Sequence, residues 1–79
     1  SRGTTLRFSL ASGARVSLGM YDAAGRLVRE VTRGSLPAGD HAAEWDLRDG
    51  NGSAVGAGLY FARLEVGGRT LVRRVAVTR

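Results

Sequence analysis

Apolar and polar residues alternate along most of this chain, which is typical of β-strands with one buried face. Between Thr4 and Leu10, for example, Leu6, Phe8 and Leu10 fall on one face and polar residues on the other. The same alternation returns in residues 15–22, 26–32, 40–46, 59–66 and 69–78, with turn-forming residues between these segments. No segment keeps the period of a helix for long. The pattern predicts an all-β fold: an immunoglobulin- or fibronectin-III-like antiparallel β-sandwich of about six to seven strands.

The inward positions of the predicted strands supply the expected core. These positions are Leu6, Phe8, Leu10, Val16, Leu18, Met20, Trp45, Tyr60 and Leu64. In the third strand Val28 and Val31 stand three residues apart, which predicts a β-bulge or an early end of the strand. We expect a loop from Gly34 to Gly39, because Pro37 and the two glycines interrupt the alternation there. The longest irregular stretch lies between residues 47 and 58 and contains four glycines.

Two segments predict tight hairpins. Asp22 stands three residues before Gly25, which suits a type I turn followed by a residue of positive φ, and hence a three-residue hairpin loop. In such a loop the Asp22 carboxylate accepts hydrogen bonds from nearby backbone N–H groups, and Arg26 lies beside it. The pair Gly67 and Gly68 predicts a two-residue hairpin in which both residues take positive φ. We interpret the run from Tyr21 to Arg26 as a structural corner, because no nucleophile or base accompanies it.

Composition limits the classes of function. The chain has 79 residues, which suits one domain, and no cysteine, which excludes a disulfide or a cysteine-based metal site. Its net charge is +5 and every basic residue is arginine, with a local cluster at Arg69, Arg73, Arg74 and Arg79. This charge favours anionic partners, although GC-rich coding equally explains an arginine-rich, lysine-free composition. No apolar run approaches the roughly 20 residues of a membrane-spanning helix.

The loop after residue 48 carries a partial calcium-binding pattern. Asp49, Asn51 and Ser53 have the first oxygen spacings of an EF-hand loop, but Ala54 and Tyr60 stand where that loop needs glycine and glutamate. A weak cation site is therefore the alternative to a plain connecting loop.

Other polar side chains offer little chemistry. His41 is the only histidine, so neither a transition-metal site nor a Ser-His-Asp arrangement is expected, and we expect its ring to pack over Trp45. The acidic residues Asp40, Glu44 and Asp46 share the opposite face of that strand, where they keep an exposed sheet soluble. Single-strand nucleic-acid binding needs exposed stacking aromatics, and only Tyr21 and Phe61 occupy outward positions, so a nucleic-acid partner is not the expected one.

Several segments then follow one another in the order of a known domain. They are residues 4–10, 16–28, 36–41, 44–49 and 58–64, followed by the arginine-bearing strand 73–77. Together they resemble the FlgD-like immunoglobulin-type domain and the related C-terminal sorting domain (type A) of type IX secretion, over nearly the whole chain. The resemblance implies a non-enzymatic module with no cofactor, commonly placed at the C-terminal end of a large exported protein.

The two branches of this resemblance imply different roles. In the sorting branch, an outer-membrane secretion machine recognises the domain, which is then usually cleaved off as the cargo is attached to anionic lipopolysaccharide. In the flagellar branch, the domain belongs to the scaffold that caps the growing hook. The recognition residues implied are Tyr21, Asp22, Gly25 and Arg26 in the turn, and Arg73, Arg74, Val75, Val77 and Arg79 in the last strand. The Asn-Pro pair that often precedes the first strand of the family would lie upstream of Ser1.

We expect residues 1–79 to form one domain, the C-terminal module of a larger exported protein, which is secreted or carried on a bacterial cell surface. Its main function is sorting by secretion machinery, with an anionic surface glycolipid as a further partner. The first alternative is a structural module that contacts neighbouring protein domains, either a hook-cap scaffold or a filament subunit that self-associates through edge strands. The second alternative is an anion- or nucleic-acid-binding module.

Overall fold

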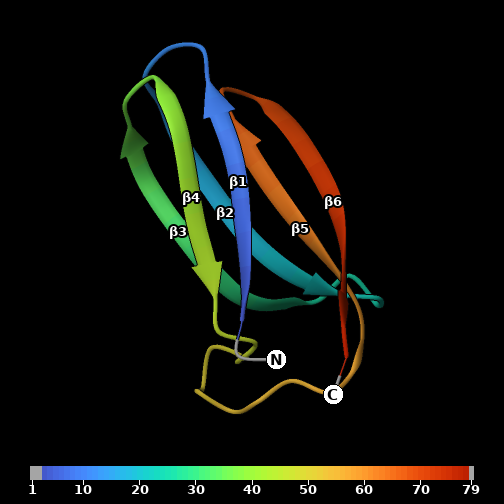
Figure 1. The fold of residues 1–79 in the computed structure, drawn as a ribbon. Helices are drawn as coiled ribbons and strands as arrows, with labels where there is room; N and C mark the ends of the chain where they lie inside the picture. The colour runs from blue at the N-terminus through green and yellow to red at the C-terminus, as the bar shows by residue number, and fades with distance from the viewer. Residues whose placement is uncertain (1–2, 79) are drawn as a thin grey trace.

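Two antiparallel sheets face each other in this protein (Figure 1). The computed structural model describes residues 3–78, which form six strands and no helix, so no helix in this part of the chain could cross a membrane. The strands are β1 (Thr4–Leu10), β2 (Ala14–Asp22), β3 (Leu27–Leu36), β4 (Gly39–Trp45), β5 (Gly58–Val66) and β6 (Arg69–Val77). The predicted all-β sandwich is confirmed.

The two sheets differ in width. The smaller sheet has the order β1-β4, and the larger one has the order β3-β2-β5-β6. In Figure 1 the pair β4 and β1 lies in front of the left and middle part of the larger sheet, whereas β6 stands to the right with no strand in front of it. The smaller sheet therefore covers only part of the inner face of the larger one.

The core lies between the sheets. Seven of the nine predicted core residues are buried, with Met20 and Trp45 fully enclosed, whereas Phe8 and Tyr60 are half-buried at the rim. The structure adds Leu47, Ala62 and Val77 to the buried set. The Trp45 ring meets the Tyr60 ring edge-on at a centroid distance of 5.4 Å, a geometry that aromatic pairs favour.

Strand β3 contains the irregularity that the spacing of its valines predicts. Its pairing with β2 shifts register twice, once between Leu18 and Gly19 and once between Met20 and Tyr21 of β2. The extra residues on β3 allow Val28 and Val31 both to pack against the core. The bulge is thus confirmed, and it follows from the need to bury two side chains of unsuitable spacing.

The loop expected from Gly34 to Gly39 is wrong in extent. Strand β3 continues to Leu36, and only Pro37 and Ala38 separate it from β4. Gly34 pairs with Val16 of β2 while holding φ at 138°, a conformation that glycine adopts without steric cost. Gly34 therefore lies within a paired strand and does not end it.

Candidate protein-interaction surfaces

The hairpin between β2 and β3 is closed by its own polar groups. Gly25 has φ of 86°, and its N–H donates to the Asp22 carbonyl at 3.0 Å. The Asp22 carboxylate accepts from the backbone N–H groups of Ala24 at 3.0 Å and Arg26 at 2.9 Å. Its second oxygen pairs with the Arg26 guanidinium at 3.3 Å. This is the geometry expected for a type I turn closed by an aspartate.

The electrostatics of Asp22 follow from these contacts. The N–H group of Arg26 is the main reason that the pKa of Asp22 lies below its ordinary value, and the Arg26 charge and the Ala24 N–H add to the effect. A carboxylate held in this way is a poor general base, because its charge is already neutralised by fixed donors. The hairpin turn therefore has a structural role. Its exposed surface is still open to contact by a partner.

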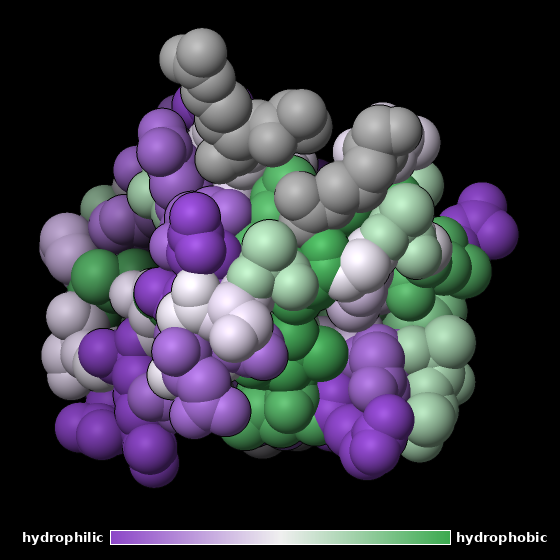
Figure 2. All heavy atoms as spheres, turned by 90° about the horizontal axis from the view of Figure 1, so that it is seen from below, coloured by the Kyte–Doolittle hydropathy of each residue, from purple (hydrophilic) through white to green (hydrophobic). Residues whose placement is uncertain are grey.

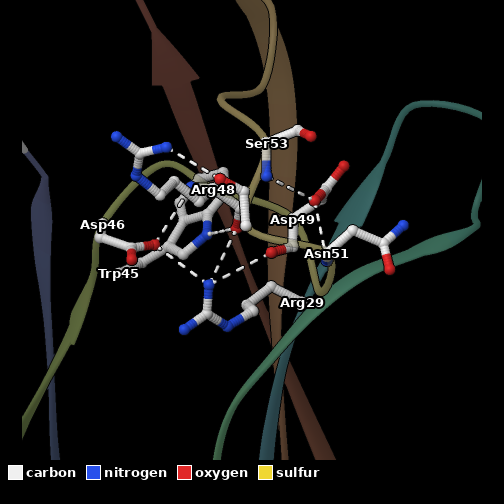
Figure 3. Close-up of polar contacts among 8 residues, drawn as sticks. Arg29, Trp45, Asp46, Arg48, Asp49, Asn51 and Ser53 are labelled. Carbon is white, nitrogen blue, oxygen red and sulfur yellow. Dashed lines mark hydrogen bonds and ion pairs between the residues drawn. The ribbon is translucent and has the colours of Figure 1, made fainter.

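A second polar cluster closes the loop between β4 and β5 (Figure 3). The guanidinium of Arg29, from β3, donates to the Asp46 carboxylate at 3.2 Å and to the carbonyls of Arg48 at 3.4 Å and Asp49 at 3.3 Å. The indole N–H of Trp45 also donates to the Arg48 carbonyl, at 2.9 Å. Arg29 thereby joins β3 to this loop through carbonyls that also accept from the Trp45 indole and from the Gly52 N–H.

The residues of the partial calcium pattern are used to shape this loop. One carboxylate oxygen of Asp49 accepts from the N–H groups of Asn51 at 2.9 Å and Ser53 at 3.0 Å. In residues 3–78 no group of three or more acidic, histidine or cysteine side chains is placed to hold a metal ion. A turn motif with a side-chain acceptor at its first position explains the Asp-x-Asn-x-Ser spacing.

The expectation for His41 is wrong in one respect. Its ring stacks on Phe8, at a centroid distance of 5.4 Å, and not on Trp45. The reason is strand register, because Phe8 pairs directly with His41 whereas Trp45 pairs with Thr4 at the other end of β1. The His41 Nε2 atom lies 2.7 Å from the Pro37 carbonyl, so the histidine secures the short β3–β4 connection.

The residues proposed from the resemblance divide between two faces of the larger sheet. Tyr21 of β2 pairs with Phe61 of β5, which pairs with Arg74 of β6, so these three share the outer face. Arg73 pairs with the buried Ala62 and therefore lies on the inner face. The recognition residues that the resemblance implies therefore do not share one surface of the structure.

The end of β6 needs a further correction. Val75 is half-buried and packs against the core, and Val77 is only 5% exposed. A buried side chain offers nothing to a partner, so Val77 is a core residue and not a contact residue. Arg79 lies outside the described residues.

The outer face of the larger sheet carries an apolar surface that sequence reasoning missed. Leu27 is 57% exposed and Val72 is 60% exposed, and Leu59 is exposed as well. With the half-buried rings of Tyr21 and Phe61 they form what we call the outer patch. The available signal was the pair Leu59 and Phe61 at successive outward positions of β5, with Val72 outward on β6, because outward positions of an antiparallel sheet are usually polar.

Two arginines belong to this face. The Arg63 guanidinium lies over the Tyr21 ring, 4.5 Å from its centroid. Arg74 pairs with Phe61 in the same row of the sheet. Figure 2, seen from below, shows a different face, the lower end of the molecule, where hydrophobic residues also reach the surface. Aromatic residues and arginine together are typical of protein interfaces.

Comparison with known proteins agrees with this architecture. The model of the FlgD Ig-like domain matches residues 1–68. This chain belongs to the FlgD Ig-like domain family. A crystal structure of FlgD from P. aeruginosa superimposes with a TM-score of 0.70 at 24% sequence identity, over 91% of this chain and 58% of that one. The chain thus spans little more than half of that FlgD. No curated protein matches it.

Proposed function

We propose that this FlgD Ig-like domain is a structural module of a flagellar hook-cap-type assembly, which contacts neighbouring proteins through the outer patch. Membership of the FlgD Ig-like family is the observation that carries the proposal. The family resemblance implies a scaffold without catalytic activity and an extracellular location. The comparisons name FlgD in both instances and name no sorting domain, so we place the scaffold before sorting by a secretion machine.

The outer patch supplies a physical reason for protein contact. Its exposed members Leu27, Leu59 and Val72 come from three strands of one sheet. A contiguous apolar surface of this kind on a small domain marks an interaction site more often than an unused face. The arginines at Arg63 and Arg74 supply charge and stacking at the same place, and such residues provide most of the binding energy at interfaces.

Crosslinking in the native host tests this proposal. A photoreactive amino acid replaces Leu59, which is exposed at the outer patch, in the full-length parent protein. The control places the same group at Glu44, which is exposed on the opposite, smaller sheet. We expect light-dependent adducts from position 59 with structural subunits of the assembly, and none from position 44.

The outcomes separate the two branches of the family resemblance. Adducts between position 59 and an outer-membrane secretion component support the sorting function and contradict the scaffold. Equal adducts from positions 44 and 59 show that the outer patch is not the contact surface.

A further inference from the structure

A groove runs between β1 and the inner face of β6. Each of these strands has a partner on one side only among the described residues, β4 for β1 and β5 for β6. The free edge of β1 faces the part of the larger sheet that has no strand in front of it (Figure 1). An edge strand presents unpaired N–H and C=O groups, which can bind another extended chain.

The floor of the groove is apolar. Leu6 and Phe8 of β1 line one side of this space of about 250 Å³, and Leu64 and Leu71 line the other. Leu71 pairs with Leu64 and so points toward the inner side, yet it remains 56% exposed. A third strand beside β1 would cover Leu71 and complete the smaller sheet over β6.

The rim of the groove is positively charged. Arg7 of β1 and Arg73 of β6 both line it. The ion pairs found among residues 3–78 engage Arg26, Arg29 and Arg33, and include neither of these two. Their charges are therefore available to carboxylates of a partner.

We propose that this groove binds an extended segment of a partner protein in which apolar and acidic residues alternate. The segment adds to the free edge of β1 as a third strand. Its apolar side chains face the larger sheet and lie on Leu64 and Leu71. Its acidic side chains face outward and pair with Arg7, and the long side chain of Arg73 reaches them from the exposed edge strand β6. The length required is close to the seven residues of β1. Backbone hydrogen bonds supply affinity in this mode of binding, and the alternating side chains supply specificity.

A single extended segment suits this position better than a folded second copy of the domain. Each strand of a second copy's smaller sheet has that copy's larger sheet behind it, so a copy that pairs through β1 or β4 would bring its larger sheet toward β5 and β6. A single extended segment has no sheet behind it and meets no such clash. The inference rests on the proposed function only because it treats the chain as a module that contacts other proteins. It concerns another surface, which shares only Val72 with the outer patch.

Peptide binding to the isolated chain tests the groove. The probe is a synthetic peptide as long as β1 that alternates valine and glutamate. Backbone amide signals in NMR report its position, and fluorescence anisotropy of a labelled peptide reports its affinity. We expect the amides of β1 and β6 to shift, and we expect a peptide with lysine in place of glutamate to leave them unchanged.

Two neighbouring arginines provide a matched pair of variants. Arg73→Glu, on the inner face, should weaken binding about tenfold, and Arg7→Glu should do the same. Arg74→Glu makes the same charge change one residue away, on the outer face, and should alter affinity by less than about twofold. All three side chains are exposed, so the fold should tolerate each change.

Three results would overturn the inference. The lysine peptide could bind as well as the glutamate peptide, the shifts could fall on the outer patch, or the amides of β1 and β6 could shift on concentrating the chain without peptide. The last result would make a second copy the occupant. Because the crosslinking experiment uses position 59 and this one uses Arg7 and Arg73, the scaffold proposal and the groove can each fail alone.

Discussion

Arg63 stacks on Tyr21 because the residue directly opposite Arg63 in the sheet has no side chain. Arg63 pairs with Gly19, and its guanidinium lies over the ring of Tyr21, 4.5 Å from the centroid. The Tyr21 ring and the Leu27 side chain also cover Gly19, where an added Cβ would lie 3.2 Å and 3.1 Å from them. A glycine in a strand weakens it, and a neighbouring aromatic that covers the glycine compensates.

The first prediction concerns this covered glycine. Gly19→Ala should destabilise the fold by about 1 kcal/mol, because Tyr21 and Leu27 must both move to admit the methyl group. The control is Gly56→Ala, where an added Cβ meets nothing within 4 Å and stability should stay within about 0.5 kcal/mol. Urea denaturation followed by Trp45 fluorescence measures both. Equal stability of the two variants would show that Gly19 is not packed as described.

The second prediction concerns the hairpin at Gly25. Gly25→Val should cost about 1–2 kcal/mol, because φ is 86° there and a β-branched residue is strained in that region. An added Cβ meets nothing within 4 Å, so the cost arises from backbone strain and not from a clash. Gly25→Asn should therefore cost less, since asparagine tolerates positive φ. Denaturation midpoints measure the difference, and identical losses for both variants would exclude the strain explanation.

The third prediction is a pH dependence at Asp22. Its pKa in the folded chain is lowered, chiefly by the N–H of Arg26. Between the folded and unfolded pKa values the unfolded chain binds more protons, so stability rises with pH in that window. The contribution of Asp22 is present above the unfolded value of about 3.9 and disappears as pH falls through the lower folded value.

Asp22→Asn tests this directly, because the amide oxygen can still accept from the two backbone N–H groups. The melting temperature of the wild-type chain should exceed that of the variant near neutral pH, and the two curves should converge in strong acid. Parallel curves across the acid range would contradict the assignment.

The fourth prediction concerns Arg29, whose guanidinium binds the loop between β4 and β5. Arg29→Ala should cost about 1 kcal/mol, because it removes hydrogen bonds to Asp46 and to two loop carbonyls. Arg33→Ala is the control, since Arg33 makes only an exposed ion pair with Glu30 at 3.6 Å, which is worth little. Hydrogen exchange at the amide of Ser53 should accelerate in the Arg29 variant alone. Similar exchange in both variants would show that Arg29 does not hold the loop.

The fold was predictable from the sequence because most of its strands, apart from β3, alternate apolar and polar residues. Inward residues such as Leu6, Leu18 and Leu64 stand at period-two positions and are buried. The long loop was not predictable in the same way. Leu47 has φ of 62° and is buried. It lies between Asp46 and Arg48, which both contact Arg29 of β3, and such contacts between residues distant in sequence leave no local pattern.

The candidate site was less predictable, because it depends on how strands pair. Tyr21 and Phe61 were placed outward, but only the order β2-β5-β6 brings Arg74 into their row. The groove between β1 and β6 depends on the unequal width of the two sheets, which no local pattern encodes. The recognition roles of Tyr21, Asp22, Gly25, Arg26, Arg73, Arg74 and Val75 stay predictions.

The last prediction concerns Val77, which the family resemblance suggested as a recognition residue. Because Val77 is buried, Val77→Ala should lower the free energy of unfolding by about 2 kcal/mol. The neighbouring Ala76→Ser, at an exposed outward position, should change it by less than about 0.5 kcal/mol. Removing the end of β6 would thus unfold part of the core, so loss of export after such a deletion would not identify a recognition signal. If Val77→Ala were as stable as the wild-type chain, Val77 would not be a core residue and would again be a candidate contact residue.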